Sequence, residues 1–415
     1  MRFVVRLLSI AALSAPAGAG EAWPQFRGPG GDGHSDAMGL PLRWSETENV
    51  VWKVAIQGRG WSSPVVWGRQ VWLTTATADG KEMSAVAVDR DTGKVVHSLL
   101  LFRNAEPGPI NSVNSYASPT PAIEAGRVYL HFGTYGTACL DTATGKPVWV
   151  RRDLNCDHGV GPGSSPVLSG DRLFLVFDGM DEQYVVALDK LTGRTLWKTP
   201  RDVDFGSAGG DFRKAFATPA LIRAGGREQL VCPAAWAAMA YDPQSGREIW
   251  RFRYGRGYST APKPVYAGGL MLIHSGFGIH ELHAVRPTGT GDLTETHAAW
   301  SLRGAPAKPS PLVVDGLVYL AHDRGLLTCL DLKTGERIYR ESLPGKYSAS
   351  PLLADGRIYL FDEKSTAAVV RPGREYKLLA TNALSDGCMA TPAVAGRSLF
   401  VRTKTHLYRI EQRPG

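Results

Sequence analysis

The chain has 415 residues, with a hydrophobic fraction of 43%, 47 glycines, 27 prolines and a formal net charge of +8 at pH 7. The hydrophobic fraction is ample for a folded core, and so many glycines and prolines are typical of a protein built mainly from hairpins. The lysines and arginines are scattered at turns, without a dense run or interleaved aromatic residues. This charge pattern argues against nucleic-acid binding.

Residues 1–19 have the pattern of a signal peptide. Arg2 and Arg6 give a charged start, Leu7 to Ala15 form an apolar stretch too short to span a membrane, and Ala17-Gly-Ala19 is a small-residue cleavage site. Cleavage near Ala19 is predicted, with Ala17 as the alternative. The first cysteine is Cys139, so no lipid-attachment cysteine follows the site. We expect a periplasmic or secreted protein without a transmembrane segment.

Residues 20–49 form a separate N-terminal arm. The stretch from Trp23 to Leu42 is rich in glycine and proline, and Trp23, Phe26 and Arg27 are its expected anchors. Two interpretations remain open. The arm either packs across one end of the domain that follows or acts as a lid over a central funnel.

From residue 50 onward the chain is repetitive. A hairpin motif, small-x-Asp-x-x-Thr/Ser-Gly, recurs at intervals of roughly 44 to 53 residues or a multiple of them. Asp and Thr can bond the backbone of the turn, and Gly accepts its positive φ. The five copies are Ala87–His97, Cys139–Trp149, Ala187–Trp197, Ala240–Trp250 and Cys329–Tyr339.

A second marker, Ser/Thr-Pro before an apolar segment, runs in step with the hairpins. Proline has no ladder donor to lose at the start of a strand, so each marker predicts a strand start. The seven clear copies and one divergent copy begin at Ser63, Thr120, Ser165, Thr218, Lys263 (divergent), Ser310, Ser350 and Thr391. Eight starts, each followed by about three more strands, predict an all-β, eight-bladed β-propeller of four-stranded antiparallel blades over residues 50–415.

The two ends of the repeat region complement each other. After Pro392 the last blade runs only to Leu407–Ile410 and lacks its outer strand. Val50–Ile56 precedes the first marker and can supply that strand. We therefore expect the N-terminal strand to close the ring, because an open ring would leave an unpaired edge.

Three of the hairpin motifs end in tryptophan, at Trp149, Trp197 and Trp250. A large flat ring with one N–H can wedge between neighbouring sheets when its donor finds an acceptor. We predict that these three residues dock one blade against the next.

The motif Ala187-x-Asp189-x-x-Thr192-Gly193-Arg194-x-x-Trp197 resembles the tryptophan-docking motif of quinoprotein propellers. Together with Trp23-Pro-Gln-Phe-Arg-Gly28, the chain resembles the PQQ-binding-like β-propeller repeat family over nearly its whole mature length. This resemblance implies the propeller fold. It leaves function open, because the family includes alcohol dehydrogenases that use pyrroloquinoline quinone (PQQ) and non-catalytic scaffolds, one of them the propeller subunit of the outer-membrane β-barrel assembly machinery.

The dehydrogenase branch implies features that this sequence lacks. There is no Cys-Cys pair, no Cys-x-x-Cys-His haem motif and no Glu/Asn/Asp set matching the calcium ligands of those enzymes. The chain also lacks the long insertions that build a deep cofactor site. We therefore predict no cofactor and no metal site, and PQQ with calcium is the alternative.

Polar and aromatic residues precede the predicted inner strands or follow the second strands, and in a propeller these segments share one rim. The densest group is Asn155–Ser165, in which His158 lies beside Asp157 as a base or metal ligand. The alternative role for each such residue is to stabilise a turn or face solvent. Loops that vary on a fixed framework build specificity. The candidate ligand-binding residues, from five blades, are His158, Lys214, Tyr258, Lys308 and His322.

These features favour an exported, non-catalytic binding or scaffold propeller of the bacterial cell envelope. Its expected partner is an envelope protein or a glycan, and we expect a monomer. A PQQ-dependent oxidoreductase is the second hypothesis. A glycan-binding or glycan-cleaving propeller is the third, and it rests on the aromatic and carboxylate residues of the rim.

Overall fold

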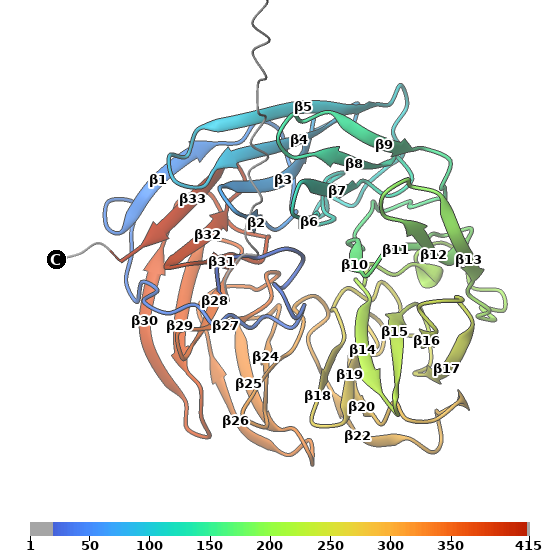
Figure 1. Cartoon of the computed structure of the whole chain (residues 1–415). Helices are drawn as coiled ribbons and strands as arrows, with labels where there is room; N and C mark the ends of the chain where they lie inside the picture. The colour runs from blue at the N-terminus through green and yellow to red at the C-terminus, as the bar shows by residue number, and fades with distance from the viewer. Residues whose placement is uncertain (1–19, 413–415) are drawn as a thin grey trace, which may run out of the picture.

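Eight β-sheets surround a common axis in the computed structural model, which describes residues 20–412 (Figure 1). The predicted signal peptide lies outside the described residues. Each blade has four antiparallel strands that follow one another outward from the axis, and the sheet of blade 4 carries a short fifth strand. The prediction of an all-β, eight-bladed propeller is confirmed.

Blades 1 to 4 contain, from the inner strand outward, β2 (Val65–Trp67), β3 (Gln70–Ala76), β4 (Glu82–Asp89) and β5 (Val95–Arg103); β6 (Ala122–Glu124), β7 (Arg127–His131), β8 (Thr137–Asp141) and β9 (Pro147–Arg151); β10 (Val167–Ser169), β11 (Arg172–Asp178), β12 (Gln183–Asp189) and β13 (Thr195–Pro200); and β14 (Ala220–Ala224), β15 (Arg227–Pro233), β16 (Ala237–Tyr241) and β17 (Glu248–Arg253). Blades 5 to 8 contain β18 (Val265–Ala267), β19 (Leu270–His274), β20 (Glu281–Val285) and β22 (Ala298–Arg303); β23 (Leu312–Val314), β24 (Leu317–Ala321), β25 (Leu326–Asp331) and β26 (Arg337–Ser342); β27 (Leu352–Ala354), β28 (Arg357–Phe361), β29 (Thr366–Arg371) and β30 (Lys377–Ala383); and β31 (Ala393–Ala395), β32 (Ser398–Arg402), β33 (His406–Glu411) and β1 (Val50–Ala55).

All eight marker prolines directly precede an inner strand, including Pro264 of the divergent copy. The second and third strands of each blade are apolar and mostly buried, because they lie between the neighbouring blades. The outer strands alternate between partly buried and exposed residues, as β1 does over its whole length. This burial pattern is the one expected of stacked sheets whose outer strands meet solvent.

The ring closes as predicted. β1 pairs with β33 in register from Trp52 opposite Arg409 to Ala55 opposite His406, and it forms the outer strand of blade 8. Figure 1 shows this blue strand beside the red C-terminal strands. Strands more than 350 residues apart in sequence, from Ala55–His406 to Val50–Ile410, therefore complete one sheet, and no blade is left without an outer strand.

Tryptophans of the outer strands lie on the Thr-Gly or Ser-Gly turns of the following blades. Trp149 donates from Nε1 to the carbonyl of Lys190 at 2.9 Å, and a Cβ added at Gly193 would lie 2.7 Å from its ring. Trp197 lies on Gly246 in the same way and donates to Pro243 O at 3.1 Å. Glycine is thus required both by a positive φ and by the indole face above it.

The structure adds two tryptophans to this set. Trp52 of β1 donates to Arg90 O at 2.9 Å and lies on Gly93 of blade 1, so the closing strand carries its own docking residue. Trp300 of β22 donates to Leu332 O at 2.9 Å and lies on Gly335 of blade 6.

Trp250 makes a different contact. Its Nε1 donates to Oε1 of Gln229 in its own blade at 2.6 Å, and its side chain is fully buried. Blade 5 lacks the Asp-x-x-Thr/Ser-Gly turn, and a Cβ added at its Gly289 would meet Leu293 and His297 rather than Trp250. Its longer hairpin instead contributes β21 (Gly291–Asp292), which pairs parallel with β17 at Trp250. Trp250 is therefore buried under that hairpin rather than seated on a glycine turn.

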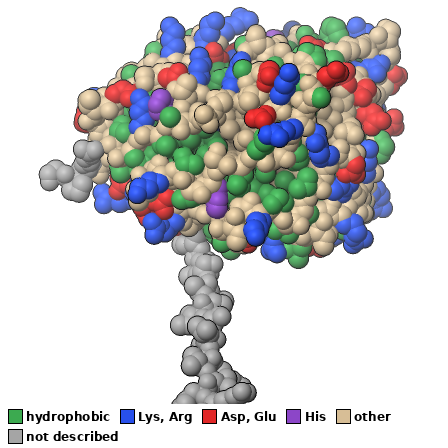
Figure 2. All heavy atoms as spheres, turned by 90° about the horizontal axis from the view of Figure 1, so that it is seen from above, with side chains coloured by type: hydrophobic (Ala, Val, Ile, Leu, Met, Phe, Trp, Pro, Cys, Tyr) green, Lys and Arg blue, Asp and Glu red, His purple; other side chains and the backbone are tan. Residues whose placement is uncertain are grey.

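Hydrophobic and charged side chains are unevenly distributed on the outer wall of the ring. Figure 2 views the side on which β1, β5 and β9 lie and shows hydrophobic side chains in areas between charged ones. Exposed aliphatic residues on these three outer strands are Val51, Val95, Val96, Leu100, Val148 and Val150.

Helical structure within residues 20–412 is limited to the 3₁₀ helix η1 (Gly210–Arg213). No helix in this range has the length and apolar character needed to cross a membrane. The five cysteines are all buried and unpaired. Cys232 lies near the end of strand β15.

Candidate functional site: the central cavity

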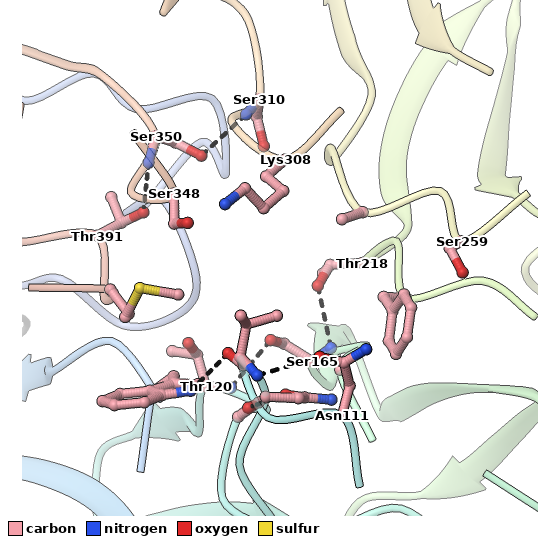
Figure 3. Close-up of a pocket in the computed structure, with 18 of the residues that line it drawn as sticks. Asn111, Thr120, Ser165, Thr218, Ser259, Lys308, Ser310, Ser348, Ser350 and Thr391 are labelled. Carbon is pink, nitrogen blue, oxygen red and sulfur yellow. Dashed lines mark hydrogen bonds between the residues drawn. The ribbon is translucent and has the colours of Figure 1, made fainter. Parts of the chain in front are cut away.

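A cavity of about 400 Å³ lies on the axis of the ring. Its wall is built from the leading loops, by which we mean the segments that precede the eight inner strands, and every blade contributes (Figure 3). The lining residues are Phe26, Trp61, Ser63, Asn111, Val113, Asn114, Ser118, Thr120, Val160, Gly163, Ser165, Asp211, Phe216, Thr218, Tyr258, Ser259, Ala261, Phe277, Lys308, Ser310, Ser348, Ser350, Met389 and Thr391.

A ring of hydroxyl groups holds the wall together. In six places, the backbone N–H of the residue before the marker proline donates to the hydroxyl of its counterpart in the next blade, at 2.9–3.0 Å. Figure 3 shows the bonds from Ser310 to Ser350 and from Ser350 to Thr391. The repeated Ser/Thr of the markers therefore links neighbouring blades around the cavity.

The N-terminal arm occupies the axis at the level of the inner strands. Trp23 exchanges backbone hydrogen bonds with Val66 of β2 at 2.8 and 2.9 Å, and Ile123 of β6 donates to Pro24 O at 2.8 Å. On the far side, Leu353 of β27 donates to Gly33 O at 2.8 Å. Because Phe26 lines the cavity, the arm forms its floor. The dark-blue segment crossing the centre of Figure 1 is this arm.

Two cations are buried beside this floor. Arg27 is fully buried and donates from Nη2 to Pro311 O at 2.7 Å and to Asp32 O. Lys263 takes the place of Ser/Thr in the blade 5 marker and is 3% exposed. Burial, and secondly the charge of Arg27, lowers the pKa of Lys263 to about 7, although Asp32 opposes the shift.

This pKa predicts a pH-dependent stability. Between pH 7 and the ordinary pKa of 10.5 the unfolded chain binds a proton that folded Lys263 does not, so the free energy of unfolding rises with pH. Compared with Lys263→Met, the wild type is expected to lose about 1.4 kcal/mol per pH unit as the pH falls through this window. Urea unfolding of both proteins from pH 6 to 10 measures the difference. A constant difference would mean that Lys263 keeps an ordinary pKa.

The mouth of the cavity is apolar between blades 4 and 5. The rings of Phe212 and Tyr258 lie 4.8 Å apart, and Tyr258 exchanges backbone hydrogen bonds with Phe277 at 2.8 and 3.0 Å. Phe212 is 47% exposed, and Phe277 and Ile279 are also exposed. We call these four residues, Phe212, Tyr258, Phe277 and Ile279, the mouth patch.

Two lining residues are charged, Asp211 and Lys308. Lys308 donates to Oε1 of Glu363 at 2.7 Å, and the Ser348 hydroxyl donates to the same oxygen at 2.6 Å. Burial tends to raise the pKa of Glu363, but these two donors outweigh it and the pKa is lowered. Lys308 is therefore held as one half of an ion pair.

His158 and Lys214 contact each other outside the cavity wall. The Lys214 Nζ lies 2.9 Å from Nδ1 of His158, and both side chains are buried. The Thr134 N–H donates to Nε2 of His158, so in a neutral imidazole Nδ1 carries the proton and Lys214 must accept it. Burial lowers the pKa of both groups. The geometry thus describes a neutral lysine amine.

A buried ion pair adjoins this contact. Nε of Arg201 lies 2.7 Å from Oδ1 of Asp178, and Lys214 donates to the carbonyl of Asp178 at 2.7 Å. Burial alone would lower the pKa of Arg201, but the Asp178 carboxylate raises it above its ordinary value. This network ties blade 3 to the loop that leads into blade 4.

The five residues predicted to reach one ligand therefore fall into three places. Tyr258 and Lys308 line the cavity, and His158 and Lys214 form the buried contact just described. His322 is buried within blade 6, where Nε2 lies 3.0 Å from the Thr328 hydroxyl. His158, Lys214 and His322 do not line this cavity. The ligand-binding role of the five residues stays a prediction.

Two lining features were not among the candidates. The hydroxyl ring could have been found, because its signal is the repeated Ser/Thr before each marker proline. Phe277 was missed because Ser275-Gly-Phe-Gly-Ile279 carries no repeat signal and only the pairing with Tyr258 brings it to the mouth.

The lining does not fit PQQ with calcium. PQQ carries three carboxylates, whereas the cationic side chain of the lining, Lys308, is already paired with Glu363. Calcium takes six to eight oxygen ligands, usually including carboxylates. No three His, Cys, Asp or Glu residues within 20–412 are arranged to hold a metal ion. The absence of a cofactor stays a prediction.

Comparison with known proteins places this fold in a family. Residues 42–149 and 234–371, more than half of the chain, match the family described as outer membrane protein assembly factor BamB. The chain belongs to this BamB family. The structure of BamB from Moraxella catarrhalis is 14% identical, with a TM-score of 0.60, covering 87% of this chain and 99% of that one.

Quinoprotein dehydrogenases share the propeller with this BamB-family chain. A europium-containing methanol dehydrogenase is 12% identical with a TM-score of 0.73, covering 94% of this chain and 91% of that chain. The quinohemoprotein alcohol dehydrogenase ADHIIG from Pseudomonas putida HK5 is 11% identical with a TM-score of 0.66, covering 96% and 81%. At these identities the likeness shows the fold alone.

One curated protein also matches in sequence. Tetrathionate hydrolase from Acidithiobacillus ferrooxidans is 22% identical over 348 residues, which are 76% of this chain. The chain spans 65% of the length of that protein.

Proposed function

We propose that this protein is an exported, non-catalytic binding propeller of the cell envelope, placed in the periplasm or outside the cell. It binds a protein partner with the mouth of its central cavity. The observation that carries the proposal is the chemistry of that cavity: hydroxyl, amide and aromatic groups line it, and the mouth patch is exposed beside it.

The lining suits recognition rather than turnover. General acid–base catalysis needs a titratable group poised to exchange a proton with substrate. Lys308 is paired with Glu363, which also accepts from the Ser348 hydroxyl, and the buried histidines and Lys214 lie behind the wall. Exposed aromatic and aliphatic residues around a concave surface are instead typical of protein-binding sites. Membership of the BamB family supports the same role.

The test is partner binding by the purified mature protein to solubilised envelope proteins. Phe212→Ala combined with Phe277→Ala is expected to weaken the complex by at least about tenfold, because truncated aromatic anchors often cost more than 1 kcal/mol each. Leu191→Ala is the matched control: Leu191 is 46% exposed and lies in a Thr-Gly turn of blade 3. Equal binding by all variants would contradict the proposal.

Hydrolysis of an inorganic sulfur compound is a second candidate, favoured by the sequence match to tetrathionate hydrolase over 76% of the chain. Incubation of the purified protein with tetrathionate, followed by measurement of thiosulfate release, decides between the two. The binding proposal expects no release above the uncatalysed rate. Saturable release of thiosulfate would contradict the binding proposal and support a hydrolase. Alcohol oxidation after addition of PQQ and calcium tests the dehydrogenase alternative in the same way.

A further inference from the structure

The two cations beside the cavity floor come from different parts of the chain and meet in the interior. Arg27 belongs to the arm and Lys263 to the start of blade 5. The backbone N–H of Lys263 donates to the Ser310 hydroxyl at 2.9 Å, which fixes the residue in the hydroxyl ring. A Cβ added at Gly31 would lie 2.2 Å from the Lys263 Nζ. The ammonium group therefore lies directly against the arm.

Their hydrogen bonding is incomplete. Nε and Nη1 of Arg27 are buried without an acceptor anywhere in residues 20–412. Within the same range Lys263 donates a hydrogen bond only from its backbone N–H, to Ser310, and neither cation forms an ion pair. The backbone carbonyls of Asp32 and Pro311 satisfy Arg27 only through Nη2.

The charge of this pair is not balanced by the protein. Asp32 is the carboxylate whose charge acts on both groups, so two cations face one anion. Lys263 can relieve the repulsion by losing its proton. Arg27 cannot at neutral pH, because burial lowers its pKa only to about 10, against the opposing effect of Asp32. A buried cation without a partner is costly, and a bound anion removes that cost.

We propose that Arg27 and Lys263 bind a small oxyanion beside the floor of the central cavity. Nε and Nη1 of the guanidinium each keep a free N–H that an oxygen of a carboxylate or an inorganic oxyanion can accept, and the ammonium adds a point charge. Gly31 leaves room for this arrangement, since any side chain there would strike the ammonium group. Phe26 precedes Arg27 and lines the cavity, so the anion lies next to the cavity and is either a free ion or the acidic end of a larger ligand.

This inference does not depend on the proposed partner. The mouth patch lies on the leading loops of blades 4 and 5 and on the turn after β19, whereas the anion site is formed by the arm and the start of blade 5. Variants of the mouth patch are expected to leave anion binding unchanged, so failure of one proposal is distinguishable from failure of the other.

Isothermal titration of the full mature chain with sulfate, phosphate and succinate in a weakly coordinating buffer tests the proposal. We expect saturable binding that Lys263→Met weakens at least tenfold and Lys263→Arg largely retains. Lys146→Met, in an exposed turn of blade 2, is the control for loss of one positive charge and is expected to bind as the wild type does. Circular dichroism verifies that each variant is folded.

The outcomes separate the two sources of the anion. Binding of sulfate and phosphate assigns the site to a free inorganic ion, and binding of succinate alone assigns it to the carboxylate end of a larger ligand. Affinity is also expected to fall as the pH rises above 7, because Lys263 between Arg27 and Asp32 then loses its proton. No binding of any of the three, or equal binding by wild type and Lys263→Met, would overturn the proposal.

Discussion

Deletion of residues 20–56 from the mature chain is expected to abolish stable folding, whereas deletion of Glu411 to Gly415 should lower stability far less. The longer deletion removes β1 from blade 8 together with Trp23, Trp44 and Trp52, which pack against the cluster formed by blades 7, 8 and 1. Loss of three packed tryptophans at roughly 3–5 kcal/mol each exceeds the total stability of many domains. Thermal unfolding followed by circular dichroism measures both truncations.

A folded variant without residues 20–56 and with a melting temperature near that of the wild type would contradict the shared blade. A more specific control keeps the arm and removes only the docking ring. Trp52→Ala is expected to destabilise the full chain but still allow it to fold, since β1 would continue to pair with β33.

The docking tryptophans give the second large effect. Trp149→Ala and Trp197→Ala are each expected to lower the free energy of unfolding by about 3–5 kcal/mol, because each leaves a cavity between two blades and a carbonyl without its donor. Trp250→Ala should cost a similar amount through loss of buried volume, although its partner is Gln229. Urea unfolding measures all three. A decrease in the free energy of unfolding below about 0.5 kcal/mol for Trp149→Ala would mean that the indole does not pack against blade 3.

A matched glycine pair isolates the contact from backbone strain. Gly193→Ala places a Cβ 2.7 Å from the Trp149 ring, whereas Gly170→Ala has the same kind of positive φ with nothing within 4 Å. Gly193→Ala should therefore cost more than Gly170→Ala in the wild type. The excess should vanish in the Trp149→Ala background.

Much of the fold could be predicted because two local signals repeat. Each marker proline sits where an inner strand begins, so even the divergent Lys263-Pro264 marks blade 5 correctly. Closure of the ring could be predicted because the last blade lacks one strand and the N-terminal segment before the first marker can supply it. The contact of Trp250 could not be predicted, because it depends on a longer hairpin in the next blade that places β21 beside it. Trp300 was overlooked for a related reason: its hairpin lacks the Asp-x-x-Thr-Gly signal.

The site was less predictable than the ring. Periodicity fixes where a strand lies but does not fix which way a loop side chain points. His158 and Lys214 belong to leading loops as expected, yet these loops fold against each other and bury the pair behind the wall. Tyr258 reaches the mouth because it pairs with Phe277, a tertiary contact without a sequence signal. The pairing of the two cations beside the floor could not be predicted, because it depends on the course of the arm. The arm places Arg27 beside Lys263, more than 230 residues later in the sequence.

Site-specific photocrosslinking in intact envelopes tests the central claim most directly. A photoreactive residue is placed at Phe277 in the mouth patch and, in a second protein, at Leu191 in a Thr-Gly turn of blade 3. The proposed function predicts one discrete protein adduct from position 277 and none from position 191. An adduct confined to position 191, or none at either position, would contradict binding through the mouth of the cavity.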